Sequence, residues 1–179
     1  CFQGFIGWYM VSSGLVDRVD VSHYRLALHL VLAFIILSLV FWSYLNCKNI
    51  YLPGKKINNF LPLVFVLFLF IQIVIGAFVS GMDAGKIYNS WPLMGESYFP
   101  NDNSVSRLFN LSAFNEPSLV QFMHRNIAYF ILGIYIFIFF KVYKNNFLKY
   151  FKVLNIIGLL LFLQIILGIF TLLSGAQIF

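Results

Sequence analysis

The sequence has few charged residues and few cysteines. Only 10% of its 179 residues are charged, whereas an average soluble domain has about 25%. Two cysteines are too few for a disulfide scaffold, and 61% apolar residues are too many for a disordered chain. This composition excludes a soluble globular domain and indicates an integral membrane protein.

Motifs of several common chemistries are also missing. The sequence contains no Gly-rich phosphate loop, no His-Glu-x-x-His, no Cys-x-x-Cys and no Gly-x-Ser-x-Gly. All six acidic residues fall outside the long apolar stretches, which disfavours a transporter that relays protons through carboxylates. The net charge of +6 does not indicate nucleic-acid binding, because the basic residues are dispersed along the chain.

Long apolar stretches define the fold class. A helix needs roughly 20 residues to cross a hydrocarbon core of about 30 Å. Stretches of this length occur at Tyr24–Leu45, Phe60–Gly81, Val120–Phe140 and Val153–Gly175. The apolar segment from Cys1 to Leu15 is too short and does not resemble a signal peptide, so we expect it to end a helix in a fragment of a longer protein. The sequence therefore predicts an all-α, polytopic membrane helical bundle.

Charge placement orients these helices. Lysines without any acid occupy the two short loops 46–58 and 141–152, so the positive-inside rule places both loops in the cytoplasm. All acids lie on the opposite side, which includes the polar, proline-containing segment Met82–Leu119. We expect a multi-pass protein of the bacterial inner membrane, or of the mitochondrial inner membrane if the source is eukaryotic.

A Gln-x3-Gly pattern recurs on the helices that run outward. It occurs at Gln3–Gly7, Gln72–Gly76 and Gln164–Gly168. Glutamine and glycine four residues apart share one helix face. Either the glycine permits close helix packing while the glutamine bonds across the interface, or the glycine clears room for a flat cofactor. Three copies suggest a duplicated helical hairpin.

Each of the first two copies is followed by a helix that returns inward and carries a histidine near its outer end, His29 and His124. Ionisable side chains inside a membrane are functional candidates by default, and neutral imidazole is a common transition-metal ligand. Helix bundles typically hold a flat macrocycle by axial histidines, so we predict that both ligate haem iron. A structural, hydrogen-bonded histidine is the alternative. His23 lies outside the predicted span and is interpreted as a loop residue.

Two arginines accompany these histidines. Arg25 lies four residues before His29, near the same face and closer to water, where a guanidinium can pair with haem propionates. Arg125 directly follows His124 and points about 100° around the helix, which makes it the weaker candidate. Either arginine can instead anchor a helix end at the interface.

Longer motifs surround these residues and cover almost the whole chain in one order. They are Gly4-Phe-Ile-Gly-Trp-Tyr-Met-Val-Ser-Ser-Gly14, Tyr24-Arg-Leu-Ala-Leu-His-Leu30, Gly76-Ala-Phe-Val-Ser-Gly-Met-Asp-Ala-Gly85, Tyr88-Asn-Ser-Trp-Pro-Leu-Met94 and Val120-Gln-Phe-Met-His-Arg125. This combination resembles the haem A synthase family, in its proteobacterial and mitochondrial branch. The resemblance implies two similar four-helix bundles, each holding one haem between two histidines. It also implies oxidation of the C8 methyl group of haem O to the formyl group of haem A for cytochrome oxidase.

The resemblance divides the chain into two parts. Residues 1–50 match the end of the N-terminal bundle, which holds the substrate haem, and His29 matches its second ligand. Residues 51–179 match the first three helices of the C-terminal bundle, which holds haem b, with 82–119 as its outer loop and His124 as its first ligand. We expect the missing ligand of the second bundle beyond Phe179, near position 190 by the repeat spacing.

The catalytic residues are unknown, because the family's Glu-x-x-His would precede Cys1. In the copy present here, Gln121 stands three residues before His124 and cannot exchange a proton near neutral pH. This favours cofactor binding at Gln121 over acid-base chemistry.

The resemblance also implies the molecules with which the protein works. Haem b is the cofactor, haem O the substrate and haem A the product. The partners are the lipid bilayer, an unidentified electron donor or acceptor, and as further candidates haem O synthase and cytochrome oxidase assembly factors, but no nucleic acid. Two alternatives stay open: a cytochrome b-type electron-transfer subunit without haem-modifying activity, and a non-haem scaffold or transporter with structural histidines.

Overall fold

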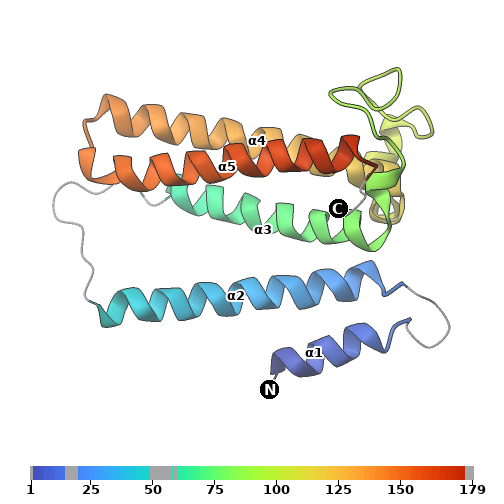
Figure 1. Cartoon of the computed structure of the whole chain (residues 1–179), viewed down its shortest axis with the longest axis horizontal. Coiled ribbons are helices and arrows are strands. Elements are labelled where there is room, and N and C mark those ends of the chain that lie inside the picture. The colour runs from blue at the N-terminus through green and yellow to red at the C-terminus, as the bar shows by residue number, and fades with distance from the viewer. Residues whose placement is uncertain (1, 15–19, 49–57, 59, 176–179) are drawn as a thin grey trace.

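The computed structural model describes residues 2–14, 20–48, 58 and 60–175, and this part of the chain is helical, without β-strands. Its long helices lie side by side along the long axis of the molecule (Figure 1). The α-helices are α1 (Phe2–Val11), α2 (His23–Cys47), α3 (Phe60–Gly81), α4 (Pro117–Lys144) and α5 (Phe151–Leu173). The helices α2 to α5 are long and apolar enough to cross a membrane, which confirms the predicted polytopic helical bundle.

The observed helix ends agree with the prediction for α3 and differ by a few residues elsewhere. Helix α4 begins at Pro117 because the fixed φ of proline suits the first helical turn, so the outer segment ends earlier than predicted. It continues to Lys144, where two lysines occupy the last turn and complement the helix dipole. Helix α5 ends at Leu173, shortly before Gly175, whose φ of +72° suits a helix C-terminus.

His23 opens α2, so its interpretation as a loop residue is wrong. Its ring packs edge-on against Phe78 of α3, with ring centroids 5.1 Å apart. Gly81 of α3 permits this approach, because a Cβ there would lie 2.9 Å from both Cα and Cβ of His23. The contact holds the outer ends of α2 and α3 together.

The helices pack in chain order, with α1 on α2, α2 on α3, α3 on α4 and α4 on α5. Two apolar clusters hold them, one toward each end of the bundle. Their buried members are Ala27, Ile75, Ala77, Phe78 and Val120 in one cluster, and Phe65, Ile131, Ile138, Val142 and Leu154 in the other. Because α3 and α4 contribute to both clusters, this pair is the centre of the bundle. Many other large apolar side chains of the spans are exposed, as expected for helices that face lipid.

The segment between α3 and α4 gathers beyond one end of the bundle (Figure 1). It contains three short 3₁₀ helices, η1 (Ala84–Lys86), η2 (Val105–Phe109) and η3 (Leu111–Asn115), and a fourth, η4 (Leu148–Tyr150), precedes α5. We call residues 82–116 the outer loop. The predictions for Cys1, for loop residues 49–57 and for the chain beyond Phe179 lie outside the described residues.

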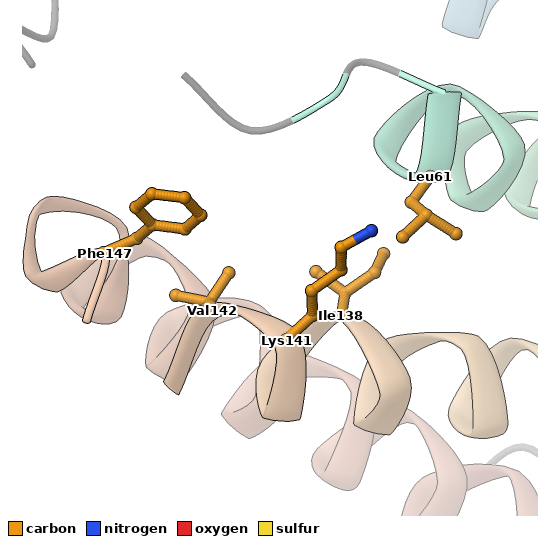
Figure 2. Close-up of a pocket in the computed structure, with 5 residues that line it drawn as sticks. All are labelled: Leu61, Ile138, Lys141, Val142 and Phe147. Carbon is orange, nitrogen blue, oxygen red and sulfur yellow. The ribbon is translucent and has the colours of Figure 1, made fainter. Parts of the chain in front are cut away.

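A small apolar cavity lies at the other end of the bundle, where α3 begins and α4 ends (Figure 2). It is lined by Leu61, Ile138, Lys141, Val142 and Phe147 and has room for about 10 Å³. This is at most the space of one water molecule. Lys141 is separated from His124 by about 25 Å along α4, so the cavity does not belong to the candidate ligand site.

Candidate functional site

His29 lies on α2 against the face of α1 that carries the first Gln-x3-Gly copy. The side-chain amide of Gln3 donates from Nε2 to the backbone carbonyl of His29 at 3.1 Å. The same nitrogen lies 3.3 and 3.4 Å from ring atoms Nδ1 and Nε2 of His29. A Cβ at Gly7 would lie 3.1 Å from Cε1 of the ring, so only glycine leaves the imidazole its present place.

His124 has the same arrangement between α3 and α4. Nε2 of Gln72 lies 3.2 Å from the backbone carbonyl of His124 and 3.2 Å from its ring atom Nε2. A Cβ at Gly76 would lie 3.1 Å from Cε1 of this ring. We call each set of glutamine, glycine and histidine a clasp: Gln3, Gly7 and His29 form the first, and Gln72, Gly76 and His124 form the second.

The clasps explain why each of the first two Gln-x3-Gly copies is followed by a helix that carries a histidine, because the glutamine and the glycine of the copy lie against that histidine. The glycine permits close approach of two helices at the place where the histidine ring lies, and the glutamine bonds across that interface. The pairing of glutamine with histidine was missed at the sequence level, although each histidine follows its repeat on the next helix. The third copy differs, because a Cβ at Gly168 would meet no atom within 4 Å in the described part of the chain.

The donor chemistry of the clasps fits haem iron. Each clasp supplies one imidazole, and an imidazole nitrogen is a usual axial ligand of haem. Six buried side-chain polar atoms have no hydrogen-bond partner among the described residues. Three belong to the clasps, namely Nδ1 of His124 and Oε1 of both clasp glutamines, and the others are Nε2 of His23, Oε1 of Gln121 and Nε of Arg125. Buried polar atoms are normally satisfied, so the three orphan atoms of the clasps mark them as places where a further group belongs.

Arg125 and Gln121 bind the outer loop. Nη1 of Arg125 donates to the carbonyls of Ser90 at 3.0 Å and Leu93 at 3.3 Å, and its Nη2 donates to the carbonyl of Tyr88 at 3.0 Å. Nε2 of Gln121, which is buried, donates to the same Tyr88 carbonyl at 3.0 Å. Both side chains therefore fasten the outer loop to α4 beside His124. Their predicted role toward haem stays a prediction.

Further contacts join the outer loop to α4. The indole of Trp91 donates to the hydroxyl of Tyr129 at 2.9 Å, and the hydroxyl of Tyr98 donates to Oδ1 of Asn126 at 2.7 Å. Met94 is 1% exposed, so its side chain is fully buried in this region. Sequence reasoning did not assign these residues, although Trp91 and Met94 lie in one of the motifs that it singled out.

The same part of the outer loop is also held by hydrogen bonds between its own residues. The hydroxyl of Tyr88 donates to Oδ1 of Asp102 at 3.0 Å, and burial and then this carboxylate raise the pKa of Tyr88. The hydroxyl of Ser90 donates to the carbonyl of Leu93 and accepts from the backbone N–H of Gly95, both at 2.9 Å. These bonds shape the segment whose carbonyls face Arg125.

Arg25 makes a smaller set of contacts at the outer end of the first clasp. Its Nη1 donates to the carbonyl of Tyr9 at 2.9 Å and lies 3.4 Å from the hydroxyl of Ser12. Its guanidinium carbon also lies 4.0 Å from the centre of the Tyr9 ring. Arg25 thus ties α2 to the end of α1. Its pairing with a propionate and its role as an anchor at the membrane interface both stay predictions.

Comparison with known proteins gives a consistent result over the whole chain. The model of a family described as cytochrome oxidase assembly protein matches residues 1–179. Among similar proteins are heme A synthases of Pelagibacter ubique, 48% identical over 99% of this chain and 52% of that protein, and of Rickettsia bellii, 43% identical over 99% and 54%. That of Flavobacterium psychrophilum is 41% identical over 99% and 53%. The chain thus spans about half the length of these curated relatives, and no solved structure matches it significantly.

Proposed function

Since the chain belongs to the family of cytochrome oxidase assembly proteins, we propose that it is part of a haem A synthase. This enzyme would oxidise the C8 methyl group of haem O to the formyl group of haem A. Conversion of the methyl to the formyl group takes one oxygen atom from water and releases four protons and four electrons, so the reaction also needs an electron acceptor, which we leave unidentified. The observation that carries the proposal is the duplicated clasp, which places one imidazole in each of two helix pairs.

The two clasps are proposed to serve different haems. His29, in residues 1–50, would ligate the substrate haem, and His124, in residues 51–179, would ligate a resident haem b, whose iron supplies redox chemistry when bound. The outer-loop contacts support this division, because Arg125 and Gln121 fasten the loop to α4 directly beside His124, whereas α2 meets it near its outer end through Tyr24, whose hydroxyl donates to Oδ1 of Asn115 at 2.9 Å. A loop that is bonded to the helix beside the histidine suits a cofactor that stays bound, whereas a substrate must enter and leave its site.

The polar residues near each histidine are proposed to orient the haem. Arg25 and Arg125 lie toward the outer side of their helices, where they would face propionate groups. The side-chain oxygen of Gln121, Oε1, is buried without a partner among the described residues, so it is available to bind a group in the same site. We assign no catalytic acid or base to the described residues.

The cellular setting is also a proposal. We place the protein in the bacterial inner membrane, or in the mitochondrial one if the source is eukaryotic, with loops 46–58 and 141–152 in the cytoplasm or matrix. Haem O synthase would supply the substrate, and cytochrome oxidase assembly factors would receive the product.

The test is to produce the gene product that carries this chain in a membrane that contains haem O but no other haem A synthase. Extraction and identification of haems should then reveal haem A. Haem b without haem A would favour the electron-transfer cytochrome. A purified protein without any haem would favour the scaffold or transporter.

A further inference from the structure

Three apolar side chains on two short helices of the outer loop are exposed in the described part of the chain. Phe109 is 87% exposed, Leu111 is 85% exposed and Val105 is 57% exposed. They belong to η2 and η3, and we call residues 104–115 the η2–η3 segment. An exposed apolar patch usually meets a membrane or another protein. The depth at which the segment lies distinguishes between these two kinds of partner.

The side chains of α2 mark the outer level of the membrane. Tyr24, in the first turn of α2, and Trp42, near its other end, are both exposed and lie about 27 Å apart along the helix. This distance is close to the thickness of a hydrocarbon core, about 30 Å, and tyrosine and tryptophan are enriched at both membrane interfaces. Leu28 and Leu39 are exposed on the same face between them, as expected for a face that meets lipid. Tyr24 therefore lies at the outer interface.

The end of η3 lies at this same level. The hydroxyl of Tyr24 donates to Oδ1 of Asn115 at 2.9 Å. Phe114 packs edge-on against Phe78 of α3, with ring centroids 6.0 Å apart, and so joins the apolar cluster at the outer end of the spans. Helix α4 begins at Pro117, shortly after Asn115. These contacts hold η3 at the membrane interface.

The exposed apolar side chains stay close to that level. Leu111 opens η3 and lies at most about 8 Å from Asn115 along this helix, which is about the depth of the interfacial region on one side of a bilayer. Charge does not oppose contact with lipid, because Arg107 is the single charged residue of the segment and its Nη1 lies 3.7 Å from Oε1 of Glu116. Through the bond between Tyr24 and Asn115, the segment adjoins the lipid-facing side of α2.

We propose that the η2–η3 segment is a membrane-interface surface, which inserts Phe109 and Leu111 into the boundary between headgroups and acyl chains on the outer side of the bilayer. Apolar side chains of interfacial helices are buried in this boundary, and each gains free energy by leaving water. The partner is lipid of any headgroup charge, because the insertion is apolar and Arg107 already lies beside a carboxylate. This surface is independent of the haem chemistry in the proposed function.

The proposal is tested with the gene product that carries this chain, in phosphatidylcholine vesicles, with its cysteines replaced by serine and a fluorescent dye on one new cysteine. The dye is attached through Asn110→Cys, between the two inserted side chains, or through Glu96→Cys, an exposed position of the outer loop outside the segment. Quenching is measured with nitroxide-labelled lipids and with iodide in water on both sides of the membrane. The test variants Phe109→Ser and Leu111→Ser replace exposed side chains and leave the buried clusters intact. Their matched control is Leu93→Ser, at an exposed leucine elsewhere in the outer loop.

The dye at position 110 should be quenched by the lipid nitroxides and protected from iodide, and the dye at position 96 should show the reverse. Each of the two test variants should lower the ratio of inserted to withdrawn segment about tenfold, as read from the quenching at position 110, and Leu93→Ser should leave it unchanged. Addition of anionic lipid should have no effect.

Three results would overturn the proposal. Iodide quenching at position 110 as strong as at position 96 would mean that the segment lies in water. Protection from both quenchers would mean that a protein surface covers the segment. Lipid quenching that occurs only with anionic lipid would mean that Arg107 binds headgroups and the apolar side chains do not insert. If no haem A is formed while the expected quenching is observed, the proposed function fails and the membrane surface stands.

Discussion

The helix pairs α1–α2 and α3–α4 hold a histidine in the same way but differ in what lies above it. Both use a glutamine and a glycine one turn apart, and in both a Cβ added at the glycine would lie 3.1 Å from Cε1 of the histidine ring. In the sequence, 11 residues (12–22) separate the helices of the first pair and 35 residues (82–116, the outer loop) separate those of the second. Arg125 and Gln121 bind that outer loop, whereas Arg25 binds the end of α1.

The comparison distinguishes the contacts that position each histidine from the contacts made by the segment that joins the two helices of a pair. Because the clasp geometry is the same with and without a long loop, the pair of helices is sufficient to place the imidazole. In the second copy Arg125 and Gln121 fasten the outer loop beside the histidine, whereas in the first copy Tyr24, at the outer end of α2, bonds Asn115 of that loop. The two helix pairs therefore share the contacts around the histidine and differ in the length and the bonds of the segment that joins their helices.

The largest expected effect comes from removing the two imidazoles one at a time. In the gene product that carries this chain, His124→Ala should deplete haem b, because its iron loses a strong axial ligand. His29→Ala should instead impair retention or turnover of haem O and leave haem b largely in place. Extraction and identification of haems from each variant, beside the unchanged protein, measure both effects.

A single outcome would break the comparison between the two pairs. If both substitutions removed the same haem to the same extent, His29 and His124 would serve one shared site. The division into a substrate pair and a cofactor pair would then be wrong.

An intermediate effect is expected from the arginines. Arg125→Lys keeps the charge but loses the planar fork that reaches the carbonyls of Tyr88, Ser90 and Leu93. Each hydrogen bond from a charged donor contributes about 1.5–3 kcal/mol, so loss of one should speed local opening about tenfold or more. Hydrogen exchange of the backbone amides in residues 88–93 measures this opening.

The control is Arg25→Lys, which alters the contacts of Arg25 with Tyr9 and Ser12 at the end of α1 and leaves the bonds between Arg125 and the outer loop in place. It should leave exchange in residues 88–93 unchanged. If Arg125→Lys instead reduced haem content without loosening the outer loop, Arg125 would act on a propionate and the loop would not depend on it.

The helices and the candidate ligands were predictable because both follow local rules. Span length, the positive-inside rule and a returning histidine after each of the first two Gln-x3-Gly copies need no knowledge of the packed structure. The bounds of α3 were predicted in full, since Gly81 ends a long apolar stretch in which Gln72 and Ser80 are the polar residues.

The covering contacts were not predictable, because they join backbone atoms to side chains far away in the sequence. The partners of Arg125 are backbone carbonyl oxygens, which every residue carries, so no residue type in the sequence identifies them. The helical start at His23 was missed for a related reason. It depends on packing against Phe78, which belongs to the next helix along the chain.

The smallest expected effect comes from adding one methyl group beside each ring. A Cβ in Gly76→Ala or Gly7→Ala would lie 3.1 Å from Cε1 of the adjacent histidine, so the imidazole must shift by a few tenths of an ångström. Overpacking of this kind typically costs about 1–3 kcal/mol, whereas alanine in place of a helical glycine gains about 0.5–1 kcal/mol. Gly168→Ala on α5, where the new Cβ meets no atom within 4 Å, should show only the gain. Thermal unfolding should therefore place Gly168→Ala slightly above the unchanged protein and both clasp variants below it. The haem absorption spectrum should change in Gly76→Ala and not in Gly168→Ala. Equal stability and equal spectra in all three variants would mean that the glycines do not hold the rings, and the two clasps would be ordinary helix contacts.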